Sequence, residues 1–158
     1  MSRNGFDVLL GKTIIRWKGC ELALFPGEDG NPSIWTAASI SYRQFFELEV
    51  ICACGSKFEF ESDMDLDGYF EMKIKPKIKE FEFYEPTESD FIRVLDLQEL
   101  PTGVVRSIET SLDEFGKIVN LKVKVGNEFA FLESGHIAIE EDSLKIRKPE
   151  DFILVRIN

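Results

Sequence analysis

Leu48-Glu-Val50 runs into Gly55-Ser56-Lys57-Phe58-Glu59-Phe60-Glu61-Ser62, and Leu121-Lys-Val123 runs into Gly126-Asn127-Glu128-Phe129-Ala130-Phe131-Leu132-Glu133-Ser134. Each stretch is an alternating strand, a glycine with a small polar residue, and a second strand that carries a Phe-x-Phe pair. This order is typical of a β-hairpin. The sequence therefore predicts a mainly β fold built around two similar hairpins, which an internal duplication or a chance resemblance would explain.

Other short stretches alternate in the same way, among them residues 70–75, 118–125 and 152–157. Residues 34–43 and 91–100 fit a short helix as well as a strand, because a short apolar run does not decide between the two. We expect antiparallel hairpins packed as a sandwich or an open barrel, with one or two short helices as an α+β alternative.

The strand from Phe46 onward has a clear two-sided pattern. Its even positions are apolar, so Phe46, Cys52 and Cys54 are expected on the core face. The carboxylates on the opposite face of this strand and of the next one are Glu47, Glu49, Glu59 and Glu61. A strip of glutamates is therefore expected on the outer face of the first hairpin.

A length of 158 residues fits a single domain, residues 1–158. A chain of this size buries about two-thirds of its unfolded surface and needs no disulfide or metal ion to stabilise its fold. An alternative divides the chain into two β subdomains, 1–85 and 91–158, joined near residues 86–90, where Pro86-Thr-Glu-Ser-Asp90 is typical of a connection.

The formal net charge of −10, with a pI near 4.7, limits the choice of partner. Nucleic acid and an anionic membrane surface are disfavoured, because both need clustered Lys and Arg. A basic protein partner is favoured, since opposite charge accelerates encounter; the alternative is that the acidity serves solubility alone.

Three cysteines argue against a disulfide framework, since an odd number leaves one unpaired. The first residues contain no apolar signal region, and no stretch approaches the roughly 20 apolar residues that cross a bilayer. We therefore expect a cytoplasmic protein.

The sharpest local motif is Asp63-x-Asp65-x-Asp67-Gly68, which matches the opening of a calcium-binding loop. The motif is incomplete, because Ile74 occupies the position of the bidentate glutamate. The alternative is an acidic, solvated hairpin loop, since Asp and Gly are common turn residues.

Catalytic signatures are missing from the sequence. His136 is the only histidine, and no nucleophile-elbow, Walker or Gly-x-Gly-x-x-Gly pattern accompanies it. We therefore expect a protein that is not an enzyme.

These observations favour a non-catalytic acidic protein that binds a basic protein, such as a toxin inhibitor of the immunity-protein kind. The expected contact residues are carboxylates with two aromatic anchors: Glu47, Glu49, Glu59, Glu61, Asp63, Asp65, Asp67, Trp35 and Tyr69. The alternative is a small β domain that binds Ca²⁺ or a small ligand at loop 63–68. The oligomeric state stays open.

Overall fold

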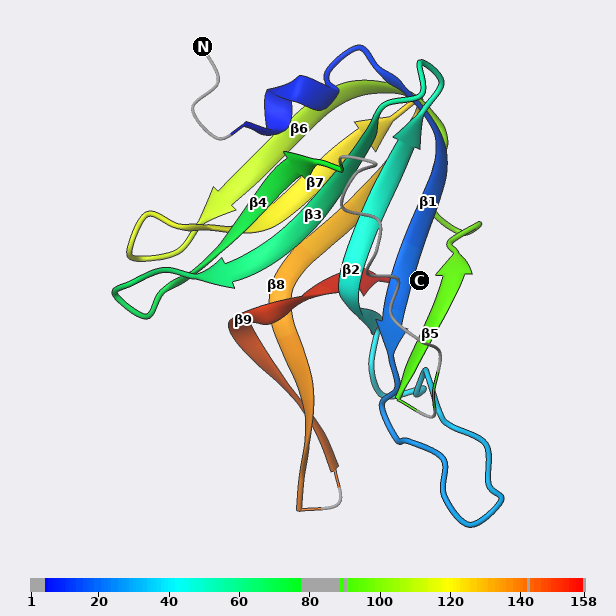
Figure 1. Ribbon diagram of the computed structural model, residues 1–158. Helices are drawn as coiled ribbons and strands as arrows, with labels where there is room; N and C mark the ends of the chain where they lie inside the picture. The colour runs from blue at the N-terminus through cyan, green and yellow to red at the C-terminus, as the bar shows by residue number, and fades with distance from the viewer. Residues whose placement is uncertain (1–4, 78–88, 90, 142, 158) are drawn as a thin grey trace.

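The computed structural model describes residues 5–77, 89, 91–141 and 143–157. A 3-10 turn, η1 (Phe6–Leu9), precedes the strands β1 (Thr13–Leu22), β2 (Tyr42–Cys52), β3 (Lys57–Met64), β4 (Phe70–Pro76), β5 (Ile92–Asp96), β6 (Gly103–Leu112), β7 (Ile118–Val125), β8 (Glu128–Glu140) and β9 (Ser143–Arg156). The strands are hydrogen-bonded in the order β4-β3-β2-β9-β8-β7-β6-β1-β5, and β2 also pairs with β1. The prediction of a mainly β fold is confirmed (Figure 1).

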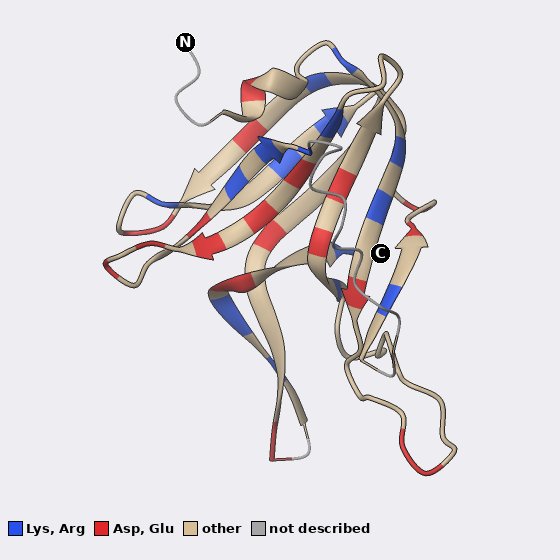
Figure 2. Ribbon diagram, viewed as in Figure 1, with Lys and Arg blue, Asp and Glu red and all other residues tan. Residues whose placement is uncertain are grey.

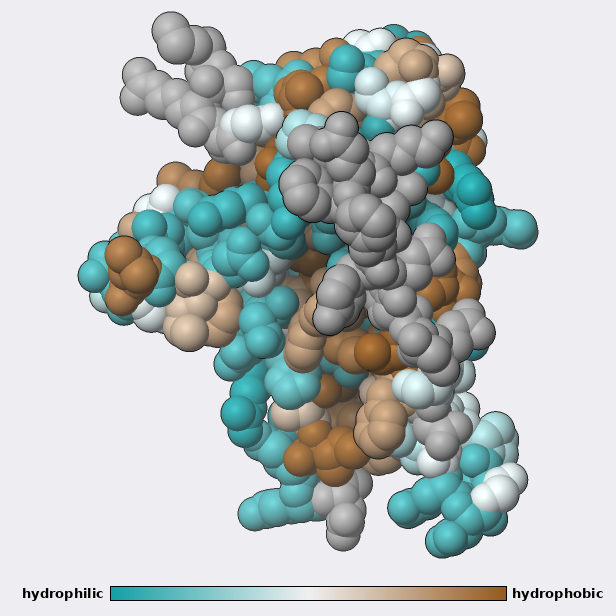
Figure 3. Space-filling view, viewed as in Figure 1, coloured by the Kyte–Doolittle hydropathy of each residue, from teal (hydrophilic) through white to brown (hydrophobic). Residues whose placement is uncertain are grey.

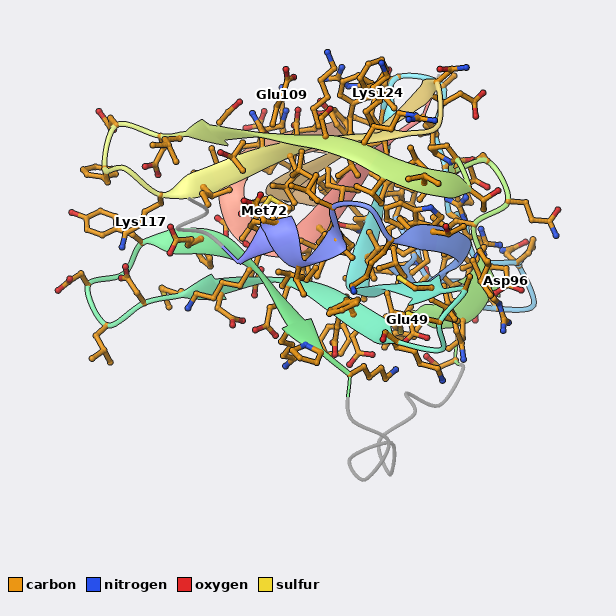
Figure 4. All side chains as sticks on the ribbon, turned by 90° about the horizontal axis from the view of Figure 1, so that it is seen from above. Glu49, Met72, Asp96, Glu109, Lys117 and Lys124 are labelled. Atoms are coloured by element: carbon orange, nitrogen blue, oxygen red, sulfur yellow. The ribbon has the colours of Figure 1, made fainter. Side chains whose placement is uncertain are left out.

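Two strands fork between neighbours and so bend the sheet into layers. β2 pairs with β9 through residues 42–45 and with β3 through residues 48–51. β1 pairs with β6 through residues 13–14 and with β5 through residues 18–22. One layer is therefore β4-β3-β2-β1-β5 and the other is β6-β7-β8-β9, and the two face each other as a sandwich (Figure 4).

The main core lies between these layers. The Phe60 ring stacks between those of Phe6 and Trp17, with centroid separations of 6.2 and 6.0 Å. Met72 of β4 points into the same space, and Leu121 of β7 belongs to the same buried cluster. A core shared by both halves of the chain favours the single domain over two subdomains. The single domain stays a prediction, because most of the expected connection between subdomains, residues 86–88 and 90, lies outside the described residues.

Both repeated stretches form hairpins, as predicted. In β2–β3 the loop 53–56 places Val50 opposite Phe58, and in β7–β8 the turn 126–127 places Val123 opposite Ala130. Phe58 and Phe60 are buried, whereas Phe129 is 42% exposed. The two Phe-x-Phe pairs therefore face opposite ways, because Ala130 and Leu132 occupy the inward positions of β8.

Irregular positions correct several sequence-based expectations. A bulge in the β1–β2 pairing, where Cys20 opposes Glu47 and Glu21 opposes Phe45, turns Phe45 into the core and leaves Phe46 exposed. Cys52 is buried as expected, but Cys54 is exposed because it lies in the hairpin loop.

The two segments with ambiguous patterns contain no described helix. Residues 91–100 contribute β5 and then a turn, in which Leu100 donates its backbone N–H to the Leu97 carbonyl. Residues 34–41 make only isolated bridges, Phe25 with Ile34 and Ala37 with Ile40. The β-branched residues Ile92 and Val94, together with edge pairing on β1, favour a strand at residues 92–96.

Candidate functional site

The predicted glutamate strip lies on the outer face of β2 and β3, away from the core (Figure 2). Lysines of the neighbouring edge strand compensate part of its charge. Lys77 Nζ is 2.5 Å from a Glu49 carboxylate oxygen, and Lys75 Nζ is 2.9 Å from one of Glu61. These carboxylates are therefore committed to partners within the chain.

The other two members of the strip are partly buried. Desolvation, the largest cause, raises the pKa of Glu47 and of Glu59, and neighbouring glutamates raise both further. The four glutamates together offer an incoming partner less free negative charge than their number indicates.

Trp35 does not join the other predicted contact residues. It belongs to the β1–β2 connection, which lies away from loop 63–68 (Figure 1). The Arg93 guanidinium lies over its ring, 4.4 Å from the centroid. This cation–π contact covers one face of the indole. Trp35 therefore packs against Arg93 and does not share a surface with the aspartates.

Loop 63–68 is a tight turn built on one carboxylate. Asp65 Oδ1 accepts the backbone N–H groups of Asp67 and Tyr69 at 2.9 and 3.0 Å. The β6–β7 connection repeats the arrangement, because Asp113 Oδ1 accepts the N–H groups of Phe115 and Lys117 at 2.9 and 3.0 Å. An Asp at the first position and a Gly at the fourth suit this turn in both loops.

These two loops lie side by side (Figures 1 and 4). The Tyr69 and Phe115 rings stack with centroids 4.3 Å apart, and Lys117 Nζ is 3.0 Å from Asp65 Oδ2. The backbone N–H groups, that of Tyr69 first, and then the Lys117 ammonium lower the pKa of Asp65. We call residues 63–69 and 112–117 the paired tips, because these contacts join them into one surface.

The paired tips expose apolar side chains among carboxylates. Leu66 is fully exposed, and Met64, Leu112 and Phe115 are each more than half exposed. The carboxylates of this surface are Asp63, Asp65, Asp67, Asp113 and Glu114, against the single cation Lys117. Figure 2 shows red segments and Figure 3 hydrophobic side chains at this end of the molecule. Such a surface suits protein contact, because an exposed apolar patch with a polar rim is typical of an interface.

The geometry gives the calcium hypothesis no ligand set. Both Asp65 oxygens are engaged, Oδ1 with backbone N–H groups and Oδ2 with Lys117. Within residues 5–77, 89, 91–141 and 143–157, no three His, Cys, Asp or Glu side chains are placed to hold a metal ion.

Sequence reasoning found Asp63, Asp65, Asp67 and Tyr69 but missed the second half of the surface. Leu66 and Phe115 are its most prominent apolar members. The signal was present, because Asp113-x-x-Gly116 repeats the spacing of Asp65-x-x-Gly68. What the sequence does not reveal is that the two loops are adjacent, since that depends on how the layers pack.

His136 lies in a different setting. Its ring is edge-on to Phe152 at 5.2 Å, and it lines a hollow of about 430 Å³ between β1 and the β8–β9 hairpin. Much of the lining is apolar, including Leu22, Leu24 and Ile137. This environment suits a structural histidine.

Comparison with protein-family models, with curated proteins and with solved structures finds no match to this chain. None of the described helical residues could form a membrane span, since η1 is only four residues long.

Proposed function

We propose that this chain is a non-catalytic binding protein whose paired tips dock a basic protein partner. The observation that carries the proposal is the concentration of exposed apolar side chains and carboxylates on two joined loops. A partner of this kind would cover Leu66 and Phe115 and place its cations against the surrounding acids. An inhibitor of a basic enzyme, as an immunity protein is of its toxin, is the form that the acidic composition favours.

Rigidity of the tips supports this role. Each loop is held by two N–H groups on one aspartate oxygen, and the Tyr69–Phe115 stack ties the loops together. A preformed surface loses little conformational entropy when a partner binds, so more of the contact energy appears as affinity.

The glutamate strip extends the acidic surface from the tips along β3. Glu49 and Glu61 contribute little to attraction or to direct contact, since Lys77 and Lys75 already neutralise them. We place the encounter in the cytoplasm, because three cysteines, an odd number, argue against a disulfide framework.

Affinity capture with matched variants tests the proposal. Tagged wild type is compared in native lysate with a tip-reversed variant, Asp63→Lys with Asp67→Lys and Glu114→Lys, and with a control that reverses three exposed acids elsewhere, Asp7→Lys with Glu28→Lys and Asp151→Lys. Both variants change the net charge equally, so only the position of the charge differs.

The proposal expects one stoichiometric basic protein on the wild type and on the control, released by rising salt and lost from the tip-reversed variant. Leu66→Ser should weaken the complex roughly 30-fold, because burying a leucine contributes about 2 kcal/mol. Equal capture by the tip-reversed variant, or no captured protein at low salt, would contradict the proposal.

A further inference from the structure

The outer face of the β6–β9 layer carries alternating cations and aromatic rings. In one row across the strands, Glu109 opposes Lys122, and Lys122 opposes Phe131. Farther along, Arg156 of β9 opposes Tyr42 of β2. We call Tyr42, Lys122, Lys124, Phe129, Phe131 and Arg156 the cation–aromatic ladder.

Cations and rings share the surface of this ladder. Lys122 Nζ lies 4.4 Å from the Phe129 centroid, and the Arg156 guanidinium lies 4.7 Å from that of Phe131. Lys124 lies over Phe129 as well, at 5.9 Å. An approaching molecule therefore meets positive groups and the exposed Phe129 ring together.

The charge of this face differs in sign from that of the whole chain. With Lys148, which lies over the Tyr42 ring, the face has four cations. Glu109 and Glu133 are the carboxylates paired with them: Lys122 contacts the first, and Lys148 and Arg156 contact the second. Four cations against two carboxylates leave a positive face on a chain of net charge −10.

Shape also favours contact here. A hollow of about 200 Å³ opens on this face, with Ser111, Asn120, Phe131 and Arg156 in its lining. Figure 4 shows Lys124 and Glu109 pointing away from the sandwich, on the side opposite Glu49. The paired tips project from one end of the molecule (Figure 1).

We propose that the paired tips of one copy dock on the cation–aromatic ladder of a second copy. The tips present carboxylates around Leu66 and Phe115, and the ladder presents cations around Phe129, which is 42% exposed. Both sides thus have complementary charge and an apolar centre, which together specify an interface. The two surfaces belong to different elements, so each copy retains one of each for a further contact.

This inference rests on the proposed function only in that both use the paired tips. Self-association would cover the tips, so a basic partner and a second copy compete for the same surface. A partner that binds the tips would then release single copies from the assembly.

Sedimentation velocity of the purified chain alone provides the test, over a wide concentration range at low salt. Three samples are compared with wild type: a ladder-reversed variant, Lys122→Glu with Lys124→Glu; the tip-reversed variant defined above; and an equimolar mixture of the two. The control variant with Asp7, Glu28 and Asp151 reversed has the same net charge as the tip-reversed variant, and the mixture is the control for the ladder-reversed variant.

Wild type and control should associate as concentration rises and separate at high salt. Each reversed variant should stay monomeric, with association weakened at least roughly tenfold. The mixture should associate again, because a native tip meets a native ladder and a reversed tip meets a reversed ladder. That recovery also shows that both variants are folded.

A wild type that is monomeric at every concentration, or a mixture that fails to associate, would overturn the inference. Binding of a fluorescent single-stranded oligonucleotide to a monomeric wild type, lost in the ladder-reversed variant, would overturn it in favour of nucleic acid. Since only purified chain is used, failure here is distinguishable from failure of the proposed function, which the lysate capture reports.

Discussion

Glu21 is the most deeply buried carboxylate in the described part of the chain, and replacing it should test how the interior tolerates charge. Its side chain is fully buried on β1. Arg43 donates from Nε and Nη2 to its two oxygens at 2.7 and 2.8 Å, and Arg93 donates from Nε at 2.8 Å. Arg43 also contacts Glu99, whose side chain is 43% exposed. These groups close one end of the sandwich with an ion network.

Glu21→Gln keeps the shape of the side chain but removes its charge. The new amide NH2 group also faces the guanidinium N–H groups. Donor then meets donor, so an N–H of the amide and an N–H of an arginine are both left without an acceptor. Breaking a buried pair costs about 3–5 kcal/mol. Arg43 keeps Glu99, and Arg93, about a third exposed, can turn toward water. We therefore expect the lower end, about 3 kcal/mol, which for a chain of this size lowers Tm by roughly 6–12 °C.

Urea unfolding followed by tryptophan fluorescence and by far-UV circular dichroism measures this change. Both probes are needed, because Trp35 contacts Arg93 and reports local change, whereas dichroism reports the whole sheet. Glu99→Gln is the matched control and should cost less than about 1 kcal/mol, since it removes an exposed partner of the same arginine. A loss for Glu21→Gln as small as that of the control would refute the reasoning.

Three further expectations concern packing, pH and calcium. Gly19→Ala should destabilise by about 1–3 kcal/mol, because its added Cβ would lie 2.5 Å from the Phe45 ring; urea unfolding checks this. Burial raises the pKa of Glu59, so the charged carboxylate lowers the free energy of unfolding at neutral pH. This loss of stability disappears as the pH falls through the raised pKa toward the pKa that Glu59 has in the unfolded chain. Glu59→Gln should therefore stabilise by about 0.5 kcal/mol at pH 7 and by little near about pH 4, as thermal melts across this range would show; an equal gain at both would contradict it. Calcium should leave Tm unchanged, since Asp65 is engaged within the protein, and a rise in Tm on titration would return loop 63–68 to consideration.

The alternation of apolar residues was enough to predict the hairpins, but not which face of each turned inward. Phe58 and Phe60 follow the predicted pattern, whereas Phe129 and Phe131 lie outside because Ala130 and Leu132 pack against the core. A single bulge likewise exchanges Phe45 for Phe46. Such shifts depend on the pairing of whole strands, which a local pattern does not contain.

The sequence identified only part of this candidate surface, for a related reason. Asp63, Asp65 and Asp67 stand out because they occupy alternate positions of one short stretch, yet their surface is completed by Phe115 and Lys117 from another hairpin. Trp35 was expected beside them from its chemistry alone, and Arg93 holds it elsewhere. Proximity between loops arises from layer packing, so only the structure could bring these groups together.

The candidate site differs from the rest of this acidic chain in how few cations face its carboxylates, rather than in the number of its carboxylates. Glu21, Glu49 and Glu133 are all buried, and each contacts at least one Lys or Arg. Their charges are satisfied internally and contribute little to recognition. At the paired tips one lysine faces five carboxylates, and the apolar side chains beside them point to water. Exposed apolar surface lowers solubility and gains nothing for the isolated chain, and the carboxylates beside it remain available to a partner's cations. This is the physical reason for assigning contact to the tips and not to the glutamate strip.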